Sequence, residues 1–137
     1  DWDVDLVILA GFMRILSAPF VQSLQGKMVN IHPSLLPNYK GMHTHQRVLH
    51  TGDVLHGCTV HYVTAELDAG QALTQGVLKV GLHDTVETLS NRIHVLEHLI
   101  YPQAVEWICN GTIQHLSNGE VHYKNQKLDK PIQFCQF

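Results

Sequence analysis

Hydrophobic and polar residues follow two different periods along the chain, and together they predict an α/β domain. Val4–Ala10 is apolar on both faces after Asp5, which is typical of a strand with neighbours on both sides, and Lys27–His32 is a second strand-like run. Ser17 and Gly26 mark the start and the end of a short helix between these two runs. The order strand, helix, strand predicts a right-handed parallel crossover.

The rest of the chain continues the same architecture. The later elements that we expect are a helix at His43–Thr51, strands at His56–Val63 and Ala72–Val80, a long helix from Asp84 to Gly111, and a hairpin of Thr112–Leu116 with Glu120–Lys124. The long helix has apolar residues at spacings of three and four, and Asp84 with Glu87 resembles a capping box at its start. The sequence therefore predicts a Rossmann-like, open and mostly parallel sheet with flanking helices and a C-terminal hairpin.

Two polar residues end the second strand. Asn30 and His32 are two positions apart, so their side chains point to the same face of a strand that breaks at Pro33. The carboxyl ends of strands in open parallel sheets are where ligands bind, which indicates a reaction site. A capping Asn and a loop His with satisfied hydrogen bonds are the alternative reading of this spacing.

Composition narrows the possible functions. The 137 residues are 45% hydrophobic and 15% charged, which fits one folded domain spanning residues 1–137. A net charge of -3 provides no basic surface for nucleic acid or for a membrane. The three widely spaced cysteines predict neither a disulfide framework nor a zinc ribbon, so we expect a cytoplasmic protein without a membrane span.

Candidate chemistry can be compared by residue type. His43 and His45 with His32 could supply three imidazoles to zinc, but no carboxylate or thiolate has a suitable spacing, so no metal is expected. Ser34 lacks the G-x-S-x-G context of a nucleophile. An amide suits a developing oxyanion, and the loop carboxylate Asp68 would stabilise a protonated imidazole as a general acid. These groups together predict acyl transfer through a tetrahedral intermediate.

The strand end also carries a family motif. The segment 30–37, N-I-H-P-S-L-L-P, with Asp68 downstream, resembles the N-x-H-x-S-L-L-P signature of the folate-dependent formyltransferases. Within that family, L-A-G-F-M-R-I-L at 9–16 and G-M-H-T-H at 41–45 are similar to the phosphoribosylglycinamide formyltransferases. The resemblance extends from about Val4 to about Leu128. It implies transfer of a formyl group from 10-formyltetrahydrofolate to the amine of glycinamide ribonucleotide.

The resemblance also implies roles for individual residues. Asn30 would hold the formyl oxygen, His32 would donate a proton, and Asp68 would keep His32 protonated and help to hold a proton-relaying water. The implied folate-binding residues are Met13, Arg14, Ile15, Leu16, Val21, Met28, Asn30, Val63, Thr64, Ala65, Glu66, Leu67 and Asp68. The implied ribonucleotide-binding residues are Pro33, His94 and Glu97.

The chain also departs from this family. It opens with Asp1, and the first strand and glycine-rich phosphate-binding loop of the family are missing, so we expect a domain truncated at its N-terminus. Another formyltransferase, acting on methionyl-tRNA or a sugar nucleotide, and an inactive folate-binding fragment are the alternatives. The partners that we expect are small molecules, and the sequence leaves open a monomer or a homodimer.

Overall fold

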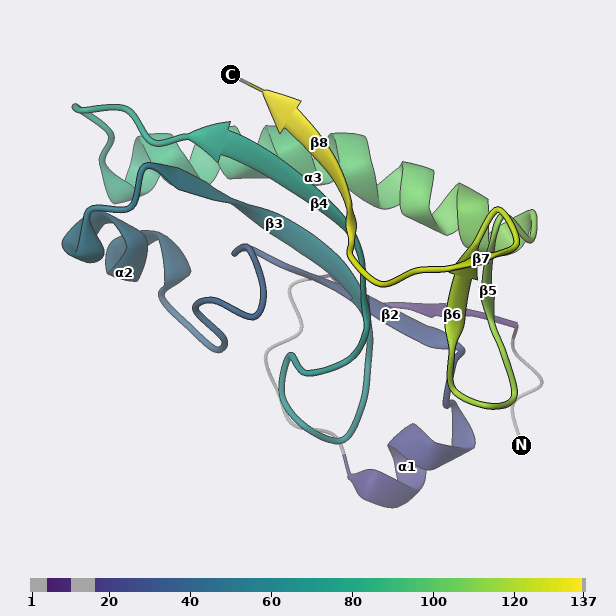
Figure 1. Cartoon of the computed structure of the whole chain (residues 1–137). Helices are drawn as coiled ribbons and strands as arrows, with labels where there is room; N and C mark the ends of the chain where they lie inside the picture. Colours follow the sequence, from purple (N-terminus) through teal and green to yellow (C-terminus); the bar gives the residue numbers. More distant parts are fainter. Residues whose placement is uncertain (1–4, 11–16, 137) are drawn as a thin grey trace.

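The computed structural model describes residues 5–10 and 17–136 of the chain. The helices and strands in this part, in chain order, are β1 (Val7–Ile8), α1 (Ala18–Ser23), β2 (Met28–His32), α2 (Thr44–Thr51), β3 (Leu55–Tyr62), β4 (Ala72–Lys79), α3 (Val86–Cys109), β5 (Ile113–His115), β6 (Val121–Tyr123), β7 (Gln126–Lys127) and β8 (Ile132–Gln136). Figure 1 shows α3 running along one face of the larger sheet, with the small C-terminal sheet at its far end.

The larger sheet has the order β1-β2-β3-β4-β8. β1 and β2 pair in parallel with α1 between them in the chain, which confirms the predicted order and parallel pairing. β3 is antiparallel to both of its neighbours, while β4 and β8 are again parallel, so the sheet of the described residues is mixed. The predicted α/β class, with an open Rossmann-like sheet and flanking helices, is confirmed.

Helix α3 supplies most of the core on its face of the sheet. Its buried residues recur at spacings of three and four, as predicted, and they are Leu89, Ile93, Leu96, Ile100 and Ala104. They pack against Cys58 and Val60, which point from β3 toward the helix. Gly76 permits this packing, because a Cβ there would lie 2.6 Å from Cγ of Leu96. The helix begins one residue later than predicted, with Thr85 and Thr88 forming the capping box.

The edge strands differ from the sequence prediction. Ile8 of β1 is 51% exposed, so the first strand is not covered on both faces within the described residues. The predicted hairpin forms as β5 and β6, and β7 adds a third strand to it. β8 was not predicted, and it adds to β4 as the other edge of the sheet. The rings of Trp107 and Phe134 stack at 6.1 Å between α3 and β8.

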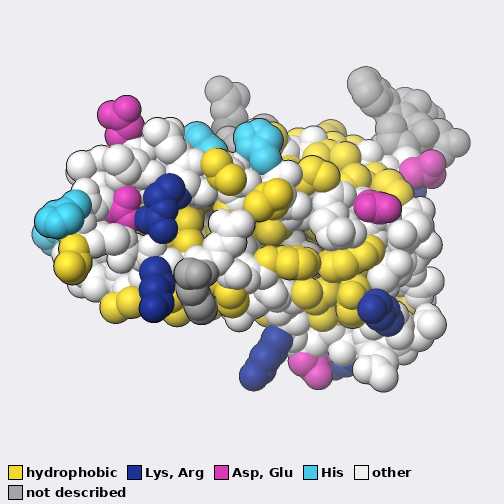
Figure 2. All heavy atoms as spheres, turned by 90° about the horizontal axis from the view of Figure 1, so that it is seen from above, with side chains coloured by type: hydrophobic (Ala, Val, Ile, Leu, Met, Phe, Trp, Pro, Cys, Tyr) yellow, Lys and Arg dark blue, Asp and Glu magenta, His cyan; other side chains and the backbone are white. Residues whose placement is uncertain are grey.

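Figure 2 shows the molecule from above, and hydrophobic side chains gather on this face. In Figure 1, α3 and β8 lie at the top, so both elements contribute to it. The exposed large hydrophobic side chains of these two elements are Val86, Val95, Leu99 and Phe134. Within residues 5–10 and 17–136, no helix is long and apolar enough to cross a membrane.

Candidate active site

The site is built on the carboxyl end of β2. Asn30 pairs with His61 of β3, and His32 pairs with Thr59, so all four side chains lie on one face of the sheet. Asn30 is 4% exposed and His32 is fully buried. The predicted convergence of an amide and an imidazole on one face is confirmed. This face is opposite to the one that α3 covers, since Cys58 and Val60 alternate with Thr59 and His61 along β3.

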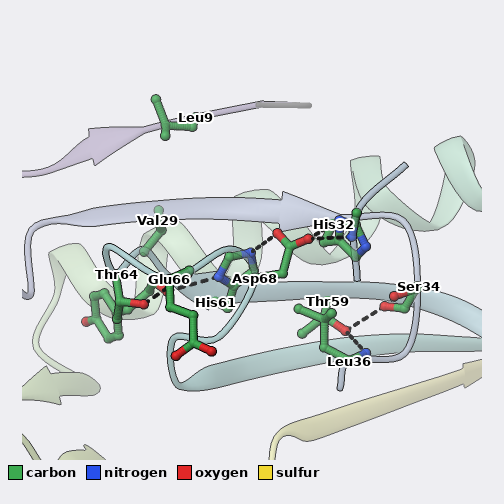
Figure 3. A network of polar contacts seen from close by, with 12 residues as sticks. Leu9, Val29, His32, Ser34, Leu36, Thr59, His61, Thr64, Glu66 and Asp68 are labelled. Carbon is green, nitrogen blue, oxygen red and sulfur yellow. Dashed lines mark hydrogen bonds and ion pairs between the residues drawn. The ribbon is translucent and has the colours of Figure 1, made fainter. Parts of the chain in front are cut away.

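Asp68 meets His32 from the loop between β3 and β4. Its Oδ2 lies 3.4 Å from Nδ1 of His32, and both side chains are almost completely buried (Figure 3). The same oxygen accepts a hydrogen bond of 2.9 Å from the backbone N–H of Gly41. Asp68 has a left-handed backbone (φ 52°), which an Asp adopts more readily than a bulky residue does. The sequence-predicted contact between this carboxylate and the strand-end imidazole therefore exists.

The two ring nitrogens of His32 have different surroundings. Nε2 lies 2.8 Å from the carbonyl oxygen of Tyr39, and because a carbonyl only accepts, Nε2 carries a proton. Nδ1 has no hydrogen-bond partner among the described residues and faces the Asp68 carboxylate. The contact of Nε2 with Tyr39 therefore fixes the ring, and Nδ1 is turned toward Asp68.

His61 completes the polar group around Asp68. Its Nε2 lies 3.8 Å from Oδ1 of Asp68, and its Nδ1 donates to the carbonyl oxygen of Tyr62. Burial lowers the pKa of His61, although the Asp68 charge opposes that effect. A neutral His61 presents an acceptor at Nε2, and a 3.8 Å gap between two polar atoms suits a bridging water. Its alternating position on β3 indicated the correct face, but no motif in the sequence assigned it to the site.

The residues expected to bind folate lie on several elements. Val21 of α1 and Met28 of β2 are buried, and Val63 at the end of β3 is half-buried. In the following loop, Thr64, Ala65 and Glu66 are exposed and Leu67 is half-buried, so Asp68 alone turns inward. Met13, Arg14, Ile15 and Leu16 lie outside the described residues.

A cavity of about 750 Å³ opens between α3 and the carboxyl ends of β1 and β2. The three residues expected to bind the ribonucleotide, Pro33, His94 and Glu97, all line it. Nε2 of His94 lies 3.8 Å from Oε1 of Glu97, and burial raises the pKa of the Glu97 carboxyl. Other lining residues include His45, His98 and Tyr101, which the sequence alone did not assign. The cavity lies on the α3 side of β2, and Pro33, which lines it, directly follows His32 in the chain.

A pair of imidazoles lies beneath this cavity. Nδ1 of His45 and Nε2 of His56 are 2.9 Å apart, so one ring donates to the other. Burial, with a smaller effect of the neighbouring His45, lowers the pKa of His56 to about 4. Burial also lowers the pKa of His45, and the nearby His94 and His32 lower it further by smaller amounts. Both rings are therefore neutral at pH 7, and the pair links α2 to β3.

Among the described residues, no group of three or more His, Cys, Asp or Glu side chains is arranged to hold a metal ion. His45, one of the three imidazoles considered for zinc, instead bonds to His56.

A buried amide and imidazole at the end of a strand, with a loop carboxylate beside the imidazole, could stabilise the tetrahedral intermediate of an acyl transfer. The profile of the formyl transferase family matches residues 1–105. The chain therefore belongs to the formyl transferase family.

Similar proteins include a purine biosynthetic protein and phosphoribosylglycinamide formyltransferases, according to their names. The chain is 50% identical over 121 residues to the human trifunctional purine biosynthetic protein adenosine-3, and 46% identical over 115 residues to the Escherichia coli phosphoribosylglycinamide formyltransferase. The phosphoribosylglycinamide formyltransferase of Coxiella burnetii has the same fold, with a TM-score of 0.90 and 46% identity over 96% of this chain. A formyltetrahydrofolate deformylase of Pseudomonas syringae is more distant, with a TM-score of 0.79 and 28% identity over 87% of this chain.

The chain spans only part of each relative. The region aligned with the human protein includes 88% of this chain but only 12% of the human protein. The region aligned with the E. coli protein includes 84% of this chain and 54% of the E. coli protein. It spans 62% of the Coxiella chain and 40% of the deformylase chain.

Proposed function

We propose that the protein carrying this chain transfers the formyl group of 10-formyltetrahydrofolate to the primary amine of glycinamide ribonucleotide, a step of purine biosynthesis. The observation that carries the proposal is the buried contact of 3.4 Å between Oδ2 of Asp68 and Nδ1 of His32, on the same face as Asn30. The names of relatives at 46–50% identity support this choice of acceptor. We expect the reaction to take place in the cytoplasm, between small molecules and without nucleic acid.

The chemistry follows from these three side chains. The amine lone pair of the acceptor attacks the formyl carbon, and the carbonyl electrons move to the oxygen. The Asn30 amide and Nδ1–H of His32 stabilise that oxyanion by hydrogen bonding. The intermediate then collapses: the carbonyl reforms, the bond between the formyl carbon and N10 of the folate breaks, and N10 takes up the proton that the amine loses. A water held between Asp68 and His61 would relay this proton.

Two regions would hold the two substrates. The folate would bind beside Val21, Met28 and Val63 and against the loop at 64–68. The family resemblance also implies folate contacts from Met13, Arg14, Ile15 and Leu16, which lie outside the described residues. The ribonucleotide would occupy the cavity next to α3, where Glu97 accepts hydrogen bonds from hydroxyl groups and His94 offers a donor. Pro33 joins the two regions, because it lines this cavity and directly follows His32.

Replacing His32 tests the proposal. In the full-length protein, His32→Ala is expected to lower kcat of formyl transfer by about 10²–10³-fold, because a hydrogen-bond donor to the oxyanion is lost, while the Kd of the folate changes little. Near-normal turnover by this variant would contradict the assignment. The assay should compare three formyl acceptors: glycinamide ribonucleotide, methionyl-tRNA and an amino-sugar nucleotide. Transfer to water should be measured as the release of free formate.

The other functions considered give different results in that assay. Transfer to methionyl-tRNA or to the sugar nucleotide would move the protein to another branch of the family. Release of formate without an added amine would indicate a hydrolase, as the name of the similar deformylase describes. Folate binding without any transfer would favour an inactive binding module.

A further inference from the structure

A row of four polar side chains crosses the larger sheet beneath the loop that follows β2. His32, Thr59, Gln75 and Gln133 are successive backbone partners across β2, β3, β4 and β8, so their side chains share the catalytic face. His32 and Thr59 are fully buried, and Gln75 is 4% exposed. The row joins the last strand of the sheet to the imidazole at its other end.

The two middle members of the row have every hydrogen-bonding group paired. Thr59 Oγ1 donates to the carbonyl of Ser34 at 2.7 Å and accepts from the N–H of Leu36 at 3.1 Å (Figure 3). The Gln75 amide donates to the carbonyl of Leu36 at 3.0 Å and to Thr59 Oγ1 at 3.1 Å. Its oxygen accepts from Nε2 of Gln133 at 3.0 Å. This pairing uses both donors and the acceptor of Gln75, and it fixes the orientation of the amide.

The loop held by these bonds returns to the imidazole. Ser34 Oγ donates to the carbonyl of Asn38 at 2.6 Å, and the next carbonyl, that of Tyr39, accepts from Nε2 of His32 at 2.8 Å. A shift of the loop at Leu36 would therefore move the acceptor that orients His32. The distance from Nδ1 to Asp68 depends on that orientation.

We propose that Gln75 is a positioning residue for His32. Gln75 sets the loop at 34–39 by holding Leu36 and Thr59, and the loop sets the imidazole through the Tyr39 carbonyl. Gln133 supports this action from β8 by fixing the orientation of the Gln75 amide. The inference rests on the proposed function only where kcat is the readout, because the orientation of His32 can be measured without any turnover.

Gln75→Met in the full-length protein tests this proposal. Methionine retains the length of the side chain but removes both amide donors and the acceptor. The matched control is Gln71→Met, because Gln71 precedes the same strand but donates to the carbonyl of Leu128, away from the loop. Gln133→Leu is a milder variant, which keeps the Gln75 amide but removes its partner.

The primary readout is the ¹⁵N NMR spectrum of histidine-labelled protein, in which the His32 signals are identified by their loss in His32→Asn. We expect Gln75→Met to shift the Nε2 and Nδ1 signals of His32, Gln133→Leu to shift them less and in the same direction, and Gln71→Met to leave them unchanged. We also expect kcat to fall about 10–100-fold in Gln75→Met, with KM of the formyl donor changed by less than about threefold.

The proposal is wrong if Gln75→Met folds and retains the His32 signals and the pH profile of kcat, since Gln75 would then only support packing. If Gln75→Met does not fold, Gln133→Leu decides: shifted His32 signals support the proposal and unshifted signals overturn it. If the parent protein transfers no formyl group, the proposed function fails. The NMR comparison still tests the positioning role of Gln75 in that case.

Discussion

The charge of Asp68 can be removed almost without changing its shape. In Asp68→Asn, the remaining amide oxygen can accept from the N–H of Gly41, as Oδ2 does now. The new NH₂ group can donate to Nε2 of His61 after a small approach, because this nitrogen now lies 3.8 Å from Oδ1 and has no hydrogen-bond partner among the described residues. We therefore expect the free energy of unfolding to fall by only about 1 kcal/mol, which is the scale of one weakened hydrogen bond.

The expected effect on catalysis is larger. At the 3.4 Å between Oδ2 and Nδ1 of His32, a carboxylate and an imidazolium attract each other by about 5 kcal/mol at an effective dielectric constant of about 20. Each 1.36 kcal/mol corresponds to about tenfold in rate, so losing this attraction lowers kcat by up to about three orders of magnitude. The reason is that His32 loses the carboxylate charge that lies beside Nδ1.

The assay is single-turnover formyl transfer by the full-length protein, with guanidinium unfolding measured in parallel. Asp84→Asn is the matched control, because Asp84 also accepts a backbone N–H and pairs with a cation, Arg92, but it lies at the start of α3. The reasoning is refuted if Asp68→Asn retains its fold and a kcat within about threefold of the parent protein. A collapse of stability in Asp68→Asn alone would instead show that the amide does not preserve the geometry.

Two further predictions concern the amide and the buried imidazole pair. Asn30→Ala is expected to lower kcat by about 10²–10³-fold, because a hydrogen-bond donor to the oxyanion is lost. Steady-state kinetics that show only a raised KM would argue against Asn30 as an oxyanion donor. His56 has a pKa of about 4 in the folded protein but about 6.5 when unfolded, so the unfolded chain takes up the proton first as pH falls through this range. Between pH 7 and pH 5, the free energy of unfolding should therefore drop by about 2 kcal/mol more in the parent protein than in His56→Gln. Guanidinium unfolding at the two pH values measures this difference, and equal drops in the two proteins would contradict the lowered pKa of His56.

Local patterns in the sequence were enough to predict the strand end that carries the site. Asn30 and His32 share a face because strand side chains alternate, and the proline after them ends the strand. The face of β3 that carries His61 followed from the same alternation. The apolar stripe of α3 was also predictable, because its period is that of a helix.

Contacts between distant segments were not predictable from periodicity. Asp68 reaches His32 only because β3 and β4 pair as neighbours and the loop between them turns inward at a left-handed residue, so only residue chemistry and the family motif indicated this contact. β8 has few residues, follows Pro131 and is mostly exposed, and its place beside β4 depends on tertiary pairing. The start of α3 was shifted by one residue because Asp84 binds Gly81 and Arg92 instead of capping the helix.

The central claim is that Asn30, His32 and Asp68 act on one formyl carbon. A crystal structure of the full-length protein with a stable analogue of 10-formyltetrahydrofolate, in which carbon replaces N10, tests it most directly. The account predicts the formyl oxygen within hydrogen-bond distance of the Asn30 amide and Nδ1 of His32, and the open side of the formyl carbon facing the cavity lined by Pro33 and Glu97. A formyl group bound away from both donors would contradict the account.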